Sequence, residues 1–206
     1  MGPDEAPPTG LLDTLRGPVD GVECILAPAQ PPLETLAADL RQVQSKPGRG
    51  RQQNAGAMAA SGRWFWFVHS DSQLPEDAIT RVLEFIKGPP CIGYCRLRFA
   101  DDGPWLTGLN ALGANLRSRW LGLPYGDQGL CLPQSWFHRL GGFREHLARG
   151  EDLDLVVRAA KQGLTVRGMD LTLTTSARRY REHGWLMTTL KHQQQAWRLV
   201  RAARQP

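Results

Sequence analysis

The sequence predicts one α/β domain with three layers, in which helices cover both faces of a central sheet. Strand-like apolar runs alternate with helical segments along most of the 206 residues. One run, residues 64–68 (WFWFV), is apolar at every position, as expected for a strand covered on both faces. Hydrophobic residues make up 41% and charged residues 22% of the chain, which is typical of a globular protein that buries a core.

The first elements are short. Residues 11–15 predict a short helix, and residues 22–26 (VECIL) predict a buried strand. The strand runs into a proline-rich break at residues 27–32, which excludes regular structure there. Apolar side chains then recur on one helical face of residues 33–43, so we expect an amphipathic helix.

A glycine-containing turn follows and leads into a helix of small residues at 52–60, which can lie close to a sheet. The apolar strand at 64–68 comes next and stops at a polar triplet, His69-Ser70-Asp71. Pro75 opens a further helix, and the acids that follow it favour a helix start through the dipole.

The second half continues the alternation. We expect helices at residues 105–121, 134–140, 153–162 and 185–203. We expect strands at residues 92–99 and 129–132, and one or two strands within residues 164–174. No internal repeat is visible. The predicted organisation is a tail (residues 1–10), the α/β domain (residues 11–184) and a basic amphipathic terminal helix (residues 185–206).

Composition excludes some classes of protein. No run of about 18 apolar residues predicts a membrane-spanning helix, and the start of the chain lacks the pattern of a secretory signal. The four cysteines lie in apolar surroundings without a zinc spacing, so we interpret them as buried free thiols in a reducing cytoplasm. The net charge of +5 suits an anionic partner, but no nucleic-acid motif is present, so we expect no nucleic-acid partner.

Three polar segments are candidates for chemistry. The triplet at 69–71 directly follows a strand, and ligands of open α/β sheets bind beyond strand ends. Its His69 and Asp71 are residue types that can bind a divalent metal. The same triplet also fits an ordinary turn. Glu151 and Asp152 open a helix. A carboxylate at this position can be held as a general base, or its only role can be a favourable interaction with the helix dipole. The segment around Tyr125 is a tight turn that alone indicates little.

The order of these pieces is more specific than any one of them. RGRQQNAG at 49–56, WFWFVHSDS at 64–72, LPYGDQG at 123–129 and LGGFREHLARGEDLDL at 140–155 resemble the family 2 glycosyltransferases. More narrowly, the pattern is similar to the bacterial subfamily of arsenosugar-biosynthesis glycosyltransferases. The resemblance covers about residues 46–195. It implies a GT-A fold, a nucleotide-diphosphate sugar donor, an acceptor hydroxyl, inversion at the anomeric carbon and a divalent metal, Mn²⁺ or Mg²⁺.

The resemblance also implies roles for individual residues. The metal and diphosphate position is Asp71, with His69 beside it, and the catalytic base is Asp152 of the Glu151-Asp152 pair. The acceptor side corresponds to Tyr125, Asp127 and Gln128. The donor and its diphosphate correspond to Arg51, Asn54, Arg178, Arg179 and His183. The nature of the sugar, the nucleotide and the acceptor does not follow from these residues.

The sequence departs from the family at its amino-terminal end. Such enzymes open with an apolar strand ending in Pro-x-x-Asn-Glu, whereas only a tail and a short helix precede residues 22–26 here, so we expect the first strand to be missing. The turn at residues 27–30 also lacks the acid that contacts the nucleotide in the family. Residues 22–26 would then form an exposed edge that favours self-association.

Several hypotheses follow from this departure. The chain is an active transferase with an unusual donor site, a catalytically degenerate relative that still binds, or a product of a wrongly assigned start codon. A different class is a basic membrane-surface or nucleic-acid binding module. The terminal helix favours contact with an anionic lipid surface, through Trp185 and Trp197 mixed with arginines, so a cytoplasmic protein peripheral to the inner face of the membrane is expected. Packing of the same helix on the domain is the alternative.

Overall fold

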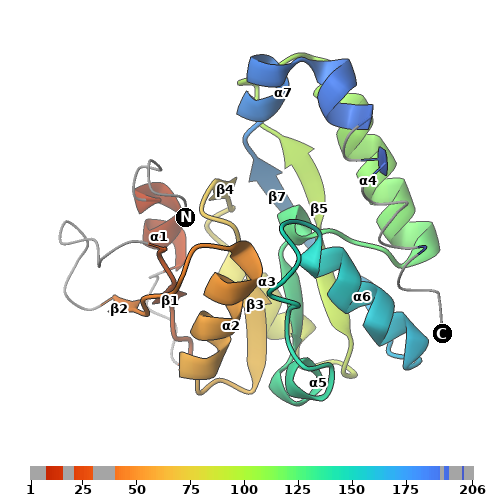
Figure 1. The fold of residues 1–206 in the computed structure, drawn as a ribbon. Coiled ribbons are helices and arrows are strands. Elements are labelled where there is room, and N and C mark those ends of the chain that lie inside the picture. The colour runs from red at the N-terminus through yellow and green to blue at the C-terminus, as the bar shows by residue number, and fades with distance from the viewer. Residues whose placement is uncertain (1–7, 16–20, 30–39, 191–192, 195–200, 202–206) are drawn as a thin grey trace.

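A computed structural model describes residues 8–15, 21–29, 40–190, 193–194 and 201 (Figure 1). At its centre is a five-stranded sheet with the order β3-β6-β5-β7-β4. Its strands are β3 (Trp64–Phe67), β4 (Ser72–Gln73), β5 (Ile92–Phe99), β6 (Leu130–Pro133) and β7 (Val166–Thr175). The sheet is mixed: β5 and β7 run parallel, whereas β6 is antiparallel to both β3 and β5, and β4 is antiparallel to β7.

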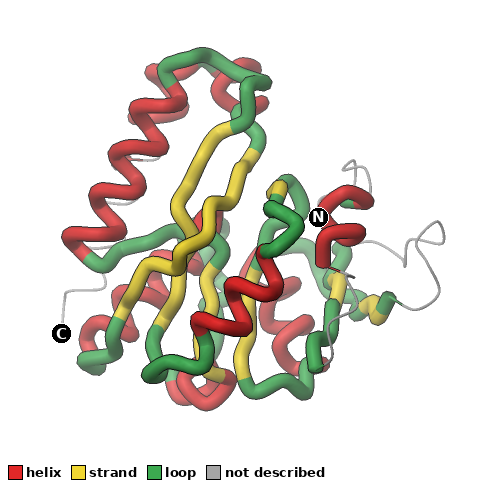
Figure 2. The backbone as a smooth tube through the Cα atoms, turned by 180° about the vertical axis from the view of Figure 1, so that it is seen from behind, coloured by secondary structure: helices red, strands yellow, loops and turns green. Residues whose placement is uncertain are grey.

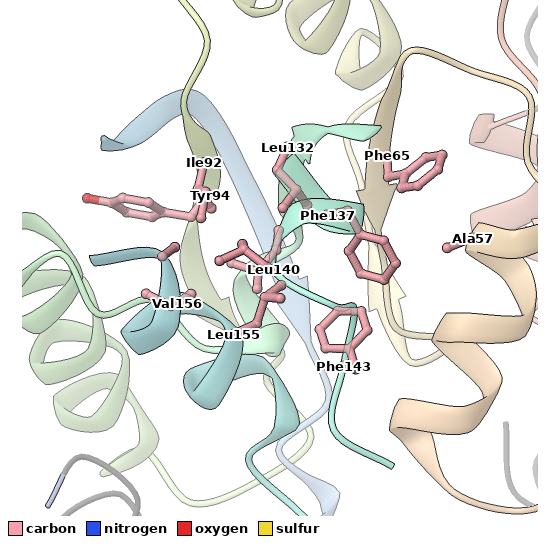
Figure 3. Close-up of a cluster of buried hydrophobic side chains, with 12 residues drawn as sticks. Ala57, Phe65, Ile92, Tyr94, Leu132, Phe137, Leu140, Phe143, Leu155 and Val156 are labelled. Carbon is pink, nitrogen blue, oxygen red and sulfur yellow. The ribbon is translucent and has the colours of Figure 1, made fainter. Parts of the chain in front are cut away.

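One face of the sheet is covered by α2 (Arg49–Ala59), α5 (Gln134–Arg139) and α6 (Glu151–Lys161). Their apolar side chains form a cluster with the strands, shown in Figure 3. Three aromatic rings lie at its centre: Phe137 is 5.6 Å from Phe65 and 5.4 Å from Phe143, measured between ring centroids. Because Phe143 lies in the loop before α6, this packing fixes the approach to that helix.

The opposite face is covered by α3 (Ala78–Phe85), and Figure 2 shows the molecule from that side. Buried residues of α3 pack there against Cys95, Cys131 and the apolar positions of β7. All four cysteines are free thiols; Cys91, Cys95 and Cys131 are buried as predicted, whereas Cys24 is half-buried. Burial raises the pKa of Cys95 to about 12, so this thiol stays protonated and acts as a small apolar side chain.

Two further helices lie near β5 and β7 in Figure 1: α7 (Arg178–His183) lies beyond their upper ends, and α4 (Thr107–Leu121) runs alongside them. The side chain of Asn115 in α4 bonds to both the N–H and the C=O of Leu97, which fastens α4 to β5. A helical segment at residues 185–190 follows α7 and lies against α4, where the indole of Trp185 donates to Asn110. No helix within the described ranges has the length and apolar character needed to cross a bilayer.

A small second sheet contains β1 (Ile25–Leu26) and β2 (Arg41–Gln42), which run parallel. It is separate from the main sheet, where β3 is an edge strand of the part that the structure describes. Glu23 connects the two, because its Oε1 atom accepts from the backbone N–H groups of Ser61 and Gly62 just before β3. The helix α1 (Thr9–Leu15) buries Leu11 and Leu12.

The expected three-layer α/β architecture is confirmed, with local differences. The strand expected at residues 22–26 is reduced to Ile25–Leu26, and the predicted helix at 33–43 is wrong at its end, where Arg41–Gln42 forms β2. Most of that predicted helix lies outside the described residues. The sequence did not predict β4 or α7, and residues 164–174 form one strand, β7.

Candidate active site

Four segments meet beyond one end of the sheet: the turn after β3, the short 3₁₀ helix η1 (Gly126–Gln128), and the starts of α6 and α2. The backbone N–H of Gly126 donates to Oδ2 of Asp152. A Cβ atom placed on Gly126 would lie 2.5 Å from that oxygen and 3.0 Å from Nε2 of His69. Only glycine therefore fits where the η1 turn passes between the β3 turn and α6.

Asp152 has a defined orientation. Its Oδ2 atom accepts from Gly126, and its Oδ1 atom accepts from the backbone N–H of Leu153 at 2.7 Å. The side chain is 9% exposed. A carboxylate fixed by two backbone donors is held at one position, which is the first requirement for a general base.

Glu151 is more deeply buried than its neighbour, with 1% of its surface exposed. Its Oε2 atom has no hydrogen-bond partner among the described residues. Burial and the nearby charge of Asp152 raise the pKa of Glu151, whereas the charge of Arg49 acts in the opposite direction. A buried acid with a raised pKa beside a second acid is a common arrangement of catalytic sites.

Asp127 adds a third carboxyl to this cluster. Burial and the charge of Asp152 raise the pKa of Asp127 to about 6, with a smaller contribution from Asp71, while Arg117 and Arg49 lower it. Its Oδ1 atom is buried without a hydrogen-bond partner among the described residues. Burial, with the neighbouring carboxylates adding to it, therefore favours a bound proton on Asp127.

Two arginines that lie next to this acid cluster were not among the predicted site residues. Arg49 begins α2, and its charge acts on both Asp127 and Glu151. Arg117 of α4 stacks its guanidinium on the ring of Tyr125, 3.5 Å from the centroid, and donates to the carbonyl of Leu123. The arginine-glycine-arginine run at residues 49–51 was the available signal for Arg49, whereas no local pattern marks Arg117.

The predicted donor residues on α2, Arg51 and Asn54, both have partners in the loop before α6. The amide of Asn54 bonds to both the N–H and the C=O of Phe143 and to the carboxylate of Glu145. Arg51 lies 3.8 Å from Glu145, and both side chains border a shallow depression on the surface. The structure thus places Asn54 and Arg51 at the junction of α2 with the loop before α6.

Gln128 is completely buried. Its amide nitrogen donates to the carbonyl of Cys95, and its amide oxygen accepts from Ser118 and from the N–H of Tyr125. These contacts tie η1 to β5 and α4. The side chain of Gln128 therefore holds the turn in position, while Tyr125 and Asp127 are left to line the site.

The predicted basic segment forms α7. Arg178 pairs with Glu182 at 3.6 Å, and the side chains of Arg179 and His183 lie outside what the structure describes. Tyr180 of α7 interacts with the acid cluster: burial and the charge of Asp127 raise the pKa of its hydroxyl to about 12. Asp102 accepts from Ala177 and Ser176 and so fixes the start of α7.

The carboxylates and His69 of this region are oxygen and nitrogen ligands of the kind that a divalent ion binds. Within the described ranges, no group of three or more His, Cys, Asp or Glu side chains is arranged to hold a metal by itself. Asp71 is exposed at the tip of the turn, and its charge acts on Asp127. One or two carboxylates are the usual protein contribution where Mg²⁺ is shared with substrate phosphates, so these residues fit that mode of binding.

Comparison with known proteins identifies the family. The family model described as "Glycosyl transferase family 2" matches residues 19–144, which is more than half of the chain. The matched region contains His69, Asp71 and the Tyr125–Gln128 turn, and it ends before Glu151. No curated protein sequence matches the chain.

Solved structures agree in fold. A mannosyltransferase from Pyrobaculum calidifontis, in complex with GDP-Man and Mn²⁺, superposes with a TM-score of 0.70 at 18% identity, over 98% of this chain and 62% of that one. Residues 1–349 of TarS from S. aureus, in complex with UDP-GlcNAc, give a TM-score of 0.57 at 16% identity, over 82% of this chain and 52% of that one. The chain spans less than two thirds of the length of either structure. The matched family model, supported by this shared fold, establishes that the chain belongs to glycosyl transferase family 2.

Proposed function

We propose that this protein transfers a sugar from a nucleoside-diphosphate donor to an acceptor hydroxyl, with Asp152 as the general base. The observation that carries the proposal is the convergence of Asp152, Glu151 and Asp127 with Arg49 at one end of the sheet. The fold neighbours that are complexes with GDP-Man and UDP-GlcNAc support a donor of this class.

The proposed reaction is a single displacement. The acceptor oxygen forms a bond to the anomeric carbon while the bond from that carbon to the diphosphate breaks. The acceptor proton passes to the carboxylate of Asp152, and the departing nucleoside diphosphate takes the electron pair. Attack from the face opposite the leaving group inverts the anomeric centre. Because Asp152 is held by Gly126 and Leu153, its carboxylate needs no reorganisation during the step.

Stabilisation of the leaving group is assigned to the start of α2. This helix has no acid in its first turn and instead carries Arg49 and Arg51 there. Cations at a helix amino terminus oppose the dipole, whereas an anionic diphosphate interacts favourably with both the arginines and the free N–H groups. A divalent ion, Mn²⁺ or Mg²⁺, held by Asp71 with His69 beside it would neutralise diphosphate charge as the bond breaks. Arg178, Arg179 and His183 of α7 remain candidates for the same diphosphate.

The test is a binding and turnover measurement with a panel of uridine, guanosine and thymidine diphosphate sugars, with and without Mn²⁺. We expect one nucleotide class to bind and to release its diphosphate in the presence of acceptors or, slowly, of water. Failure of every donor to bind would refute the proposal.

A second function is favoured by one observation. Both carboxylate oxygens of Asp152 accept backbone hydrogen bonds, which leaves fewer lone pairs for an acceptor proton. A degenerate member that binds a nucleotide sugar without transferring it would have this arrangement. Tight donor binding without release of the nucleoside diphosphate, over a broad range of acceptors, would support that alternative.

A further inference from the structure

The helix α4 buries its small and polar face and exposes its large apolar side chains, which is the reverse of the usual amphipathic helix. Its buried residues are small or polar: Thr107, Ala111, Ala114 and Ser118. Its large apolar residues face outward instead, with Leu109 54%, Leu112 56% and Trp120 74% exposed. Surface helices normally turn their large apolar side chains toward the core, so the outward leucines and tryptophan need another explanation.

The exposed Leu109, Leu112 and Trp120 lie on one face of the helix. Together with the half-buried Leu116 they are spaced by three or four residues and form one stripe. The stripe extends for about 16 Å along the helix axis. Trp105, which is 82% exposed, lies just before the first turn, so a tryptophan flanks the leucines at each end.

The neighbouring helical segment at residues 185–190 also exposes large apolar side chains. It is fastened to α4 because Asn110 accepts from Trp185 at 2.6 Å and donates to Thr189 at 2.9 Å. Thr188 is buried and Trp185 is half-buried, whereas Leu186, Met187 and Leu190 are exposed. Eight of the ten exposed large hydrophobic side chains in the described chain belong to these two helices or border them: Trp105, Leu109, Leu112, Trp120, Leu121, Leu186, Met187 and Leu190.

The charged residues in and directly after these segments are basic, and acidic residues are absent. No acidic residue occurs between Asp102 and Asp127, a stretch that contains all of α4 and carries Arg117 and Arg119. No acidic residue follows Glu182 either, although the sequence after it contains one lysine and three arginines. The chain has 20 Asp and Glu residues in all, so their exclusion from both stretches distinguishes this face from the rest of the protein.

We propose that the outward face of α4, together with residues 185–190, docks on the surface of an anionic lipid bilayer. Leucines and methionine would enter the boundary of the acyl chains, and Trp105 and Trp120 would lie at the headgroup level, where indole rings are favoured. Arg117 stacks on Tyr125 and does not belong to this face, but the exposed Arg119, the basic residues that follow Glu182 in the sequence and the absence of acids match the negative surface of such a membrane. A second copy of the chain fits less well, because the face offers no acidic residue to pair with Arg119 or with the basic residues that follow Glu182 in the sequence. This surface is separate from the acid cluster, and the inference does not depend on the proposed transfer activity.

The experiment is flotation of the full chain with vesicles of phosphatidylcholine alone and of phosphatidylcholine mixed with phosphatidylglycerol. We expect the protein to bind the anionic vesicles. Its affinity for the neutral vesicles should be lower by about tenfold or more. The double variant Leu112→Gln/Trp120→Gln should reduce binding by at least about tenfold. Met58→Gln is the matched control, because Met58 is 77% exposed but lies alone on α2, so its loss should leave binding unchanged.

Circular dichroism and the melting temperature would show that the variants fold, which is expected because these side chains are exposed. Quenching of tryptophan fluorescence by brominated lipids should also fall in the double variant. Equal vesicle binding by parent and double variant would overturn the proposal, as would an absence of binding to anionic vesicles. A dimer that the double variant converts to monomer, without vesicle binding by the parent, would assign the face to a second copy instead.

Discussion

The backbone N–H of Gly126 donates a hydrogen bond to Oδ2 of Asp152, and this contact joins the η1 turn to the first turn of α6. The two residues are 26 positions apart in sequence, and each comes from a segment with other candidate site residues. Disturbing this contact should therefore alter the geometry of the whole acid cluster.

The first prediction concerns Gly126→Ala. The added methyl group would lie 2.5 Å from Oδ2 of Asp152, so the turn and the carboxylate must separate. We expect turnover to fall by about 100-fold and the unfolding free energy to fall by roughly 1–3 kcal/mol. Gly113→Ala is the control, since nothing lies within 4 Å of its added methyl, and it should leave turnover unchanged. Normal turnover in Gly126→Ala would show that the contact is not part of the active arrangement.

The second prediction concerns Asp152→Asn. Removing the base should lower turnover by a factor on the order of 100 or more while donor affinity changes little. Asparagine also turns an amide NH₂ toward one of the two backbone donors, so some loss of stability is expected, and rates should be compared well below the melting temperature. Glu151→Gln should cost less turnover. If both variants keep parental rates, the pair is not catalytic.

The third prediction concerns Asp71→Ala. Asp71 is exposed at the tip of the β3–β4 turn, so its loss should leave the fold intact. We expect the enhancement of donor affinity by Mn²⁺ to disappear, as measured by isothermal titration with and without the ion. Asp170→Ala removes an equally exposed carboxylate near α3 and is the matched control. A Mn²⁺ effect that survives in Asp71→Ala would place the ion elsewhere.

The fourth prediction concerns pH. The pKa of Asp127 rises from 3.8 to about 6 on folding, so between these values the folded state binds more protons than the unfolded state. Stability contributed by this group is therefore present at low pH and is lost as the pH rises through about 6, by an amount of up to roughly 3 kcal/mol. Asp127→Asn should weaken this decline, measured by urea unfolding between pH 4 and pH 8. An identical decline in the variant would mean that other groups cause it.

The fifth prediction concerns Arg158→Met. The guanidinium of Arg158 bonds to Asp154 and to the carbonyls of Leu140 and Gly142, which fastens α6 to the preceding loop. Its loss leaves the buried carboxylate of Asp154 with Arg144 alone, so we expect a destabilisation of roughly 2–4 kcal/mol in urea unfolding. Arg81→Met removes exposed ion pairs and should cost less than about 1 kcal/mol.

The central strands and helices could be predicted because their patterns are local. The apolar run at Trp64–Phe67 and the periodic segment at Ile92–Phe99 indicate strands without knowledge of their partners. The sequence of α4 predicted a helix but not which face would be buried, since that depends on where Asn115 and Ser118 bind. Similarly, α7 begins where it does because Asp102, 75 residues earlier, accepts from Ala177.

The candidate site was predictable only in part. Asp71, Asp127 and Asp152 were predicted because the order of the motifs resembles the family, and not from any one local pattern. Spacing could not show that Asn54 would bind the loop at Phe143, or that Gln128 would be buried under α4. Nor could it identify Arg117, whose role depends on stacking against Tyr125. These contacts are long-range, so local sequence carries no signal for them.

The strand order has a consequence for how the chain is made. β3 pairs with β6 through contacts such as Trp66 with Cys131, and β4 pairs with β7 through Ser72 and Thr175. On the ribosome, the amino-terminal strands emerge long before these partners exist, so most of the sheet forms late in synthesis. Ribosome-stalled chains that end at Leu121 should therefore be digested readily by protease, whereas chains that extend beyond Thr175 should be protected. During the interval, the apolar strand β3 (Trp64–Phe67) lacks the β6 strand that pairs with it in the folded sheet.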